Sequence, residues 1–411
     1  MDQNSTENIN KFSKSIEFVI FLLFLLGPLT GNIINVLFGV LSTDFNVTPN
    51  HILTAIPAFM FPFAITQLFS GAVSDIKGRI PVLILGLILF LIAMLIAAFS
   101  FNLEMYIIAN VIGGVGFGFI NPVLIALMTD ITPGSNLAKK MGYLSASANL
   151  GVGLGPLIAS QLILIGWQSI YVLFIVITSF CLIYFFFTKK NTQFTIKEGG
   201  VHSFLSQLSK EWRRIPVILM ILSAFLISHT YLAINIWTSK TLAQTHTVNE
   251  TLIGIVLGLA GIGAAVTGIL TGNTIKKRGA FIPLVLGSII LLGSLVILLI
   301  IGEITSQEEL IILSLGWILV GLSGGILFTS ITYYSQVLSP ERRGALAGSL
   351  TAAYFIGIAL VPTTLAPFSN NYGITGIYTA ILIISIIFIV ITMLLYFITR
   401  NIVPYKSKNQ N

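Results

Sequence analysis

The chain is organised as a series of long apolar runs separated by short polar connections. Each run is close to the ~20 residues that an α-helix needs to cross a ~30 Å hydrocarbon layer. Such runs form helices in lipid because the bilayer offers no partners for backbone polar groups. We predict twelve membrane-spanning helices over residues 16–41, 51–74, 80–100, 103–129, 141–165, 168–188, 215–239, 251–273, 280–302, 309–338, 344–367 and 374–399.

The first run, 16–41, follows a polar segment and is too long for the apolar part of a signal peptide. It also lacks a small-residue cleavage site, so we expect it to be a retained span. Composition agrees with a membrane protein: 55% of the residues are hydrophobic and 9% are charged, against about 25% charged in a soluble domain. The predicted fold class is an all-α membrane protein.

Basic residues fall on alternate connections between the predicted spans. All but one of the 21 Lys and Arg residues precede span one, follow an even-numbered span or close the chain. Only Lys240 lies on the other side. Because cytoplasmic connections are rich in Lys and Arg, we predict a multi-pass protein of the cytoplasmic membrane with both termini cytoplasmic. The net charge of +7 is therefore a topology signal, and we expect no nucleic-acid partner.

The widest polar gap divides the chain into two halves of six spans. We predict a first bundle over residues 1–188, a linker over 189–214 and a second bundle over 215–411. Apolar residues recur at helical spacing in the linker, which predicts an amphipathic helix on the cytoplasmic leaflet. The halves repeat glycines and a proline at constant offsets: Gly71, Gly78 and Gly86 match Gly272, Gly279 and Gly287, and Gly142, Gly151 and Pro156 match Gly348, Gly357 and Pro362. Repeated halves are typical of secondary transporters.

The connection between spans two and three reads Gly71-Ala-Val-Ser-Asp75-Ile-Lys77-Gly78-Arg79. Glycine allows the tight turn and the close helix approach that such a short loop needs. The pattern resembles the signature loop of the major facilitator superfamily, whose fold has two six-helix bundles; the alternative is a merely short basic loop. The resemblance implies that Asp75 docks at the start of span eleven and that Arg79 pairs with Asp130. The implied conformational latch comprises Gly71, Asp75, Gly78, Arg79, Asp130 and Gly344.

Span five carries small residues and a proline at regular spacing: Gly142, Gly151, Gly155, Pro156 and Ala159. Small residues on one face let membrane helices pack closely, and a proline removes one backbone donor. The pattern resembles the antiporter motif of the drug-efflux branch of the superfamily, with Ala159 in place of a final glycine. Together with Trp167 and Tyr171, it is similar to the Bcr/CflA-type drug:proton antiporters. A generic packing stripe is the alternative interpretation.

Two positions depart from that branch. Asn110 stands in span four where the branch has an arginine, and residues 30–35 of span one hold no acid. An acid within the membrane attracts lipophilic cations and can hold a coupling proton, so these positions predict neither the cation preference nor the coupling scheme of that branch. In this family, spans one, four, seven and ten line the cavity. The resulting candidates for the substrate and proton cavity are Asn32, Asn35, Asn110, His229, Asn235 and Tyr333.

Each candidate asparagine has an alternative role as a helix–helix hydrogen-bonding residue. His229 is the titratable group placed near the middle of a span, and an unperturbed histidine titrates near pH 6.5. We hypothesise that His229 takes over part of the protonation role of the missing acid. The alternative is a neutral, hydrogen-bonded core histidine.

The function that these features favour is secondary active transport by alternating access, with proton-coupled efflux of small amphipathic compounds or drugs. A permease for a specific metabolite, such as a sugar, amino acid or organic acid, is the alternative. We expect no enzyme activity, cofactor or metal, since no nucleophile–base set, metal cluster or phosphate-binding loop lies near a span end. The expected partners are a small-molecule substrate, protons and membrane lipid, and the sequence does not determine the oligomeric state.

Overall fold

A computed structural model describes residues 3–132, 134–188, 209–245, 248–302, 307–339 and 343–400, and these residues are predominantly helical. The chain forms α1 (Gln3–Asn32), α2 (Ile34–Asp44), α3 (Pro49–Ile52), α4 (Ala55–Lys77), α5 (Arg79–Ala98), α6 (Leu103–Ile131), α7 (Gly134–Leu162), the short 3-10 helix η1 (Ile163–Ile165), α8 (Gln168–Thr188), α10 (Ile215–Thr245), α11 (Glu250–Arg278), α12 (Phe281–Ile301), α13 (Gln307–Val337) and α14 (Arg343–Thr399). The predicted all-α fold class is confirmed.

Eleven helical segments of the described chain are long and apolar enough to span a membrane. The last of them, Leu346–Thr399, has 54 residues, which at 1.5 Å per residue is about 80 Å and enough for two crossings. It turns at Gly373, whose φ of 60° and ψ of −152° are not helical. Counting this helix as two spans reproduces the twelve predicted crossings.

The first predicted span is interrupted, which the hydropathy pattern did not indicate. α1 ends at Asn32 and α2 begins at Ile34, while Ile33 accepts a short-range bond from the Val36 amide at 3.0 Å. Pro28 lies within the last turns of α1 and lacks the amide that would bond the preceding turn. The second part of span one, α2, contacts α10 and α11, whereas α1 contacts α6 and α8.

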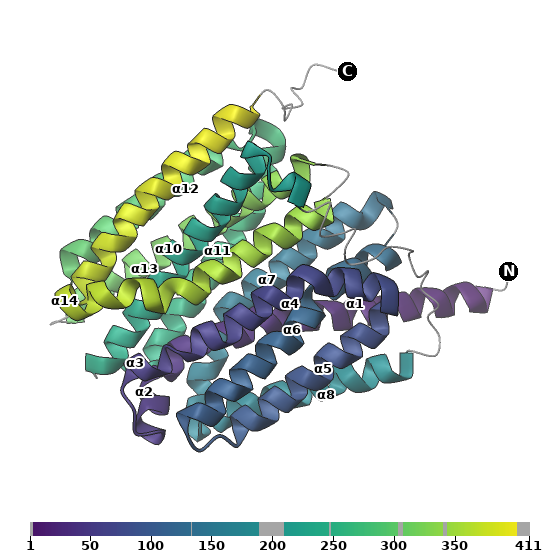
Figure 1. The fold of residues 1–411 in the computed structure, drawn as a ribbon, viewed down its shortest axis with the longest axis horizontal. Helices are drawn as coiled ribbons and strands as arrows, with labels where there is room; N and C mark the ends of the chain where they lie inside the picture. Colours follow the sequence, from purple (N-terminus) through teal and green to yellow (C-terminus); the bar gives the residue numbers. More distant parts are fainter. Residues whose placement is uncertain are drawn as a thin grey trace.

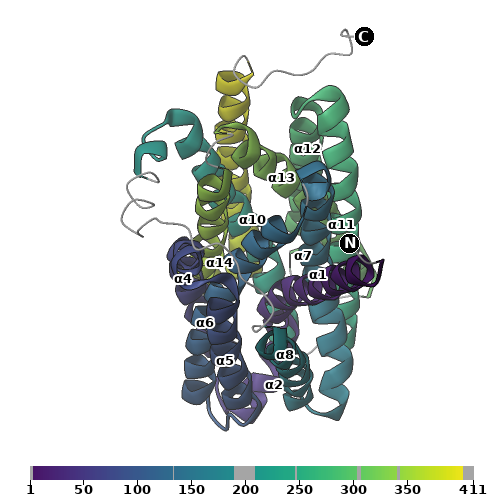
Figure 2. The same cartoon turned by 90° about the vertical axis from the view of Figure 1, so that its right-hand side faces the viewer.

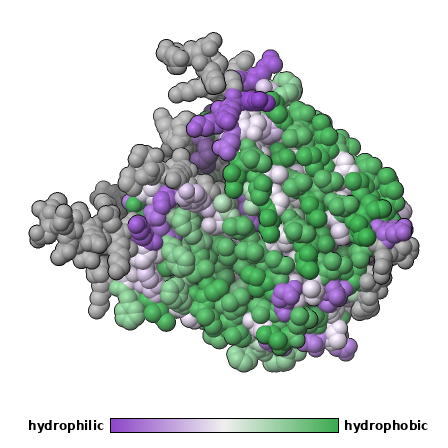
Figure 3. All heavy atoms as spheres, turned by 180° about the vertical axis from the view of Figure 1, so that it is seen from behind, coloured by the Kyte–Doolittle hydropathy of each residue, from purple (hydrophilic) through white to green (hydrophobic). Residues whose placement is uncertain are grey.

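The surface of the bundle is apolar over most of its height. Figure 3 shows hydrophobic residues covering most of one face, with hydrophilic residues gathered near its margins. On α8, for example, Val176 is 60% exposed and Phe187 is 74% exposed. A contiguous apolar surface of this extent is what a lipid environment requires.

Glycines that repeat between the halves end helices at corresponding positions. Gly78 follows α4 with φ of 91°, and Gly279 follows α11 with φ of 78°. A positive φ of this size is readily adopted only by glycine. The chain therefore turns in the same way after spans two and eight, and the repeat seen in the sequence corresponds to repeated backbone geometry.

Helices from the first and second halves of the chain lie side by side (Figures 1 and 2). α7 contacts α11, and α4 contacts α14. The α4–α14 contact includes the Phe63 and Phe355 rings, whose centroids are 4.1 Å apart. The division into bundles at 1–188 and 215–411 stays a prediction.

The predicted linker helix falls largely on residues 189–208, which lie outside the described part. The end of the linker contacts the second half. Trp212 donates from Nε1 to the Ser349 Oγ at 2.9 Å, and Arg214 donates to the Leu338 carbonyl at 3.2 Å. Arg214 also pairs with Glu211 at 2.7 Å. These contacts hold the start of α10 against α13 and α14.

Candidate functional site

The connection between α4 and α5 is a turn of one residue, Gly78. This turn places Arg79 at the first position of α5 and directs its side chain back toward the end of α4. The Arg79 side chain is 10% exposed. A guanidinium that is this well buried needs partners for its charge and for its N–H groups.

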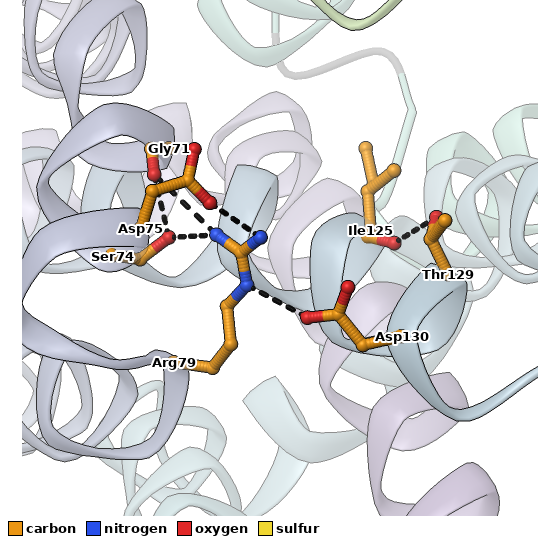
Figure 4. A network of polar contacts seen from close by, with 7 residues as sticks. All are labelled: Gly71, Ser74, Asp75, Arg79, Ile125, Thr129 and Asp130. Atoms are coloured by element: carbon orange, nitrogen blue, oxygen red, sulfur yellow. Dashed lines mark hydrogen bonds and ion pairs between the residues drawn. The ribbon is translucent and has the colours of Figure 1, made fainter. Parts of the chain in front are cut away.

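Arg79 contacts two carboxylates and one hydroxyl (Figure 4). It lies 2.5 Å from Asp75 on α4, and its Nε donates to Asp130 on α6 at 3.0 Å. Its third nitrogen donates to the Ser74 Oγ at 2.6 Å. The Ser74 hydroxyl in turn donates to the Gly71 carbonyl at 2.7 Å. One arginine thus joins the ends of three membrane helices.

Both carboxylates occupy unfavourable positions by themselves. Asp75 lies in the last turn of α4 and Asp130 in the last turn of α6. The C-terminal end of a helix carries a partial negative charge, which repels a carboxylate. Arg79 compensates both, since its planar group bonds more than one acceptor. Without this cation, two like charges would face one another at the helix ends.

The structure places four latch candidates in this cluster: Gly71, Asp75, Arg79 and Asp130, beside the turn at Gly78. The surroundings of Gly344 lie outside the described residues, so the expected docking of Asp75 there stays a prediction. A Cβ added at Gly71 would meet no atom within 4 Å, so nothing packs against that position in this conformation. Ser74 was not among the candidates from the sequence, although it directly precedes Asp75.

A second charged contact near the ends of the helices was also missed. Glu17 on α1 forms an ion pair with Lys140 on α7, and their side chains are 18% and 23% exposed. One turn further along, the Phe21 and Tyr143 rings of the same two helices meet edge to face at 6.2 Å. Span one therefore does contain an acid, but it lies near the start of the span and already has a counter-ion.

The span-five glycines pack α7 against α1. A Cβ at Gly151 would lie 2.3 Å from the Leu25 carbonyl oxygen, and one at Gly155 would lie 2.6 Å from the Leu29 carbonyl oxygen. Gly142 is in α7, but its surroundings lie outside the described residues. The packing stripe is thus real, and its role in antiport stays a prediction.

The opposite face of α7 contains the contact that joins the two halves. A Cβ at Gly261 on α11 would lie 2.2 Å from the Gly153 Cα on α7. One at Gly254 would lie 2.7 Å from the Pro156 carbonyl oxygen. Neither Gly153 nor the α11 glycines were candidates from the sequence. On α11 the glycines at 254, 258 and 261 recur at every third or fourth residue, which is typical of a close helix contact, but this spacing did not indicate α7 or Gly153 as the partner.

The first-half cavity candidates have separate surroundings. Asn32 donates from Nδ2 to the Pro28 carbonyl at 2.7 Å, within its own helix. Asn35 on α2 is 3% exposed, and its Oδ1 has no hydrogen-bond partner among the described residues. Asn110 donates to the Tyr106 carbonyl at 2.8 Å, and the Tyr106 and Tyr171 hydroxyls share a bond of 2.6 Å.

Asn110 and the two tyrosines line a small cavity of about 30 Å³ inside the first half, beside the break in span one. Thr30, Phe59 and Met60 complete part of its wall. A space of this size accommodates water rather than an amphipathic compound. This cavity is therefore too small for the expected cargo in this conformation.

Two of the cavity candidates in the second half form hydrogen bonds between helices. The Asn235 Oδ1 on α10 accepts from the Trp317 Nε1 on α13 at 2.6 Å. His229 on α10 bonds the Gly357 carbonyl at 2.8 Å and the Thr364 hydroxyl at 3.0 Å, both on α14. Tyr333 is partly buried, with its ring 5.8 Å from that of Tyr334. The structure therefore does not bring all six candidates together in one cavity.

Comparison with known proteins adds to this picture. The sequence model of the Major Facilitator Superfamily matches residues 20–362. Over 148 residues the chain is 34% identical to the Quinolone resistance protein NorA of Staphylococcus aureus, covering 36% of this chain and 37% of that protein. Over 101 residues it is 35% identical to the Multidrug resistance protein 2 of Bacillus subtilis, covering 25% of each. The matches thus span about a third of the length of these relatives, or less.

Two solved structures share the fold over nearly the whole chain. The D-xylose-proton symporter superposes with a TM-score of 0.70 at 14% identity, covering 92% of this chain and 97% of that chain. The human organic anion transporter MFSD10 superposes with a TM-score of 0.67 at 18% identity, covering 92% and 99%. At these identities the likeness concerns the arrangement of the helices.

Proposed function

We propose that this chain, which belongs to the Major Facilitator Superfamily, exports small amphipathic compounds or drugs in exchange for protons. Members of this family are membrane transporters and carry out no enzymatic reaction. The observation that carries the proposal is the likeness to two drug-resistance proteins, at 34% and 35% identity over the matched stretches. We place the chain in the cytoplasmic membrane with both termini in the cytoplasm, which the distribution of Lys and Arg supports.

The contacts between the halves support transport by alternating access. Gly153 and Gly261 bring the backbones of α7 and α11 together, because small residues let membrane helices approach closely. The Arg79 cluster fixes the ends of α4, α5 and α6 as one unit. The first half thus moves as a rigid body against the second, and exposes a shared site to either side.

His229 is suited to bind and release the coupling proton, because its ring has hydrogen-bond partners in both the neutral and the charged state. A carbonyl only accepts, so Nδ1 carries a proton and donates to Gly357. In the neutral ring, Nε2 accepts from the Thr364 hydroxyl. In the charged ring, Nε2 donates to the Thr364 Oγ1, and the hydroxyl proton turns to the Leu360 carbonyl, 2.8 Å away. No acidic or basic side chain among the described residues forms an ion pair with it.

A permease for one metabolite is the second candidate. The observation that favours it is a buried, uncharged side-chain amide in the interior. Gln67 on α4 is 3% exposed, and neither of its amide atoms has a hydrogen-bond partner within the described ranges. Unpartnered buried amides suit a hydroxyl-bearing or amide-bearing substrate better than a lipophilic one.

Accumulation of several unrelated fluorescent dyes in cells that express the chain separates the two candidates. We expect lower dye accumulation than in cells carrying an empty vector, and loss of the difference when a protonophore collapses the proton gradient. Exclusion that persists with the protonophore would contradict proton coupling. Unchanged accumulation of every dye would favour the permease.

Exchanging His229 for asparagine is expected to flatten the dependence of transport on pH. Asparagine retains a donor for the Gly357 carbonyl but does not titrate. Dye efflux from energised vesicles, measured between pH 5.5 and pH 8.5 (a range of roughly three units around the ordinary pKa of histidine), provides the test. The matched control is Thr364→Ser, which keeps the hydroxyl that bonds the His229 ring and should leave the pH profile of the wild type. A wild-type pH profile in the asparagine variant would show that His229 does not hold the coupling proton.

A further inference from the structure

Lys240 is a buried cation in the last part of α10. Its residue is 3% exposed, although the sequence places it near the outer end of its span. It is also the lysine that departs from the distribution of all the other basic residues. A lysine buried at membrane depth is costly, and such residues mark a functional pathway when they persist.

No carboxylate neutralises Lys240 in the described chain. The described ion pairs involve other residues, and the contact of Lys240 is with an aromatic ring: its Nζ lies 4.6 Å from the centroid of Trp237. Attraction between a cation and an aromatic face offsets part of the desolvation cost of the ammonium group. The ring supplies no nitrogen or oxygen acceptor for the three N–H groups of the lysine.

Trp237 adds a further unused donor. Its residue is 1% exposed, and its Nε1 has no hydrogen-bond partner in the part of the chain that the structure describes. The indole nitrogen only donates, as does the ammonium group. This part of α10 therefore presents a buried positive charge beside an indole N–H that has no acceptor among the described residues. A group with negative charge and two acceptor oxygens complements it.

The Lys240 segment lies at a contact between the halves. Ala243 follows Lys240 by three residues and so shares its side of α10. A Cβ added at Gly39 on α2 would lie 3.8 Å from the Ala243 Cβ. It would also lie 2.9 Å from the Glu250 Oε1 at the start of α11. Movement of α2 away from α10 and α11 would therefore expose the segment that carries the lysine.

We propose that Lys240 and Trp237 bind the carboxylate of an aromatic substrate. The ammonium group pairs with the carboxylate, and the indole offers an N–H to the substrate and a flat face to its ring. This inference rests on the proposed export function and narrows it to amphipathic compounds that carry an acidic group, including zwitterions. Lys240 would then be the residue that favours substrates with a negatively charged group.

Binding to the purified full-length protein tests the proposal with a matched pair of ligands. The probes are a fluoroquinolone, which carries an aryl carboxylate, and its methyl ester, which lacks that charge. Loss of one charge-assisted hydrogen bond corresponds to roughly a tenfold change in Kd. We expect the acid to bind about tenfold more tightly than the ester, and we expect Lys240→Gln to abolish this preference while Lys240→Arg retains it.

Two variants keep the result interpretable. Lys276→Gln removes an exposed lysine at the far end of α11 and should leave the preference unchanged. Trp237→Phe should weaken the binding of both ligands, while the acid should still bind more tightly than the ester. Equal binding of acid and ester to the wild-type protein, absent binding of the acid, or an intact preference in Lys240→Gln would each overturn the proposal. Exclusion of a cationic dye from cells is a separate readout, so export can hold even where this inference fails.

Discussion

Replacing Arg79 with glutamine is expected to reduce transport to less than about a tenth of the wild-type rate, because two uncompensated carboxylates then remain at the helix ends. Asp75 and Asp130 are 37% and 31% exposed, so water screens part of their repulsion. We therefore expect the free energy of unfolding to fall by about 2 kcal/mol, which is less than the 3–5 kcal/mol that breaking a fully buried ion pair costs. Dye efflux per molecule of protein in the membrane is the measurement.

Two variants test the explanation by charge. Arg79→Lys retains the cation but loses the planar fork, and should give an intermediate rate. Asp130→Asn combined with Arg79→Gln removes one of the two carboxylates, and should recover part of the loss. If Arg79→Gln alone exported dye at the wild-type rate, the cluster would have no part in transport.

Replacing Gly261 with valine is expected to abolish transport, because no side chain fits between α11 and α7. The nearest atom to an added Cβ is the Gly153 Cα, at 2.2 Å, and backbone atoms cannot move aside as a flexible side chain does. The helices must separate, which opens the contact between the halves. We expect dye efflux at background level. We also expect the melting temperature of the purified protein to fall by several degrees, as a loss of a few kcal/mol in the free energy of unfolding implies.

Gly272→Val on the same helix is the matched control. A Cβ at Gly272 would meet no atom within 4 Å, so the variant should fold and export dye. The two substitutions have equal cost in helix propensity and differ in the neighbouring atoms. Equal loss of activity in both variants would contradict the explanation by close packing of α7 and α11.

The chain by itself determined the spans, the tight turn at Gly78 and the family resemblance. These features are local. A run of apolar residues forms a helix in lipid wherever its neighbours lie, and a glycine turn depends on one residue's φ. The pairing of Arg79 with Asp130 came from the resemblance, and the structure places the two side chains 3.0 Å apart.

The interior sites depended on the tertiary structure. Helical periodicity is weak in a span that is apolar all around, so sequence alone did not show that Gly153 faces α11 while Gly151 faces α1. It also did not show that Glu17 meets Lys140, or that Lys240 is buried. Each of these facts depends on which helix packs beside which face, and only the assembled bundle decides that.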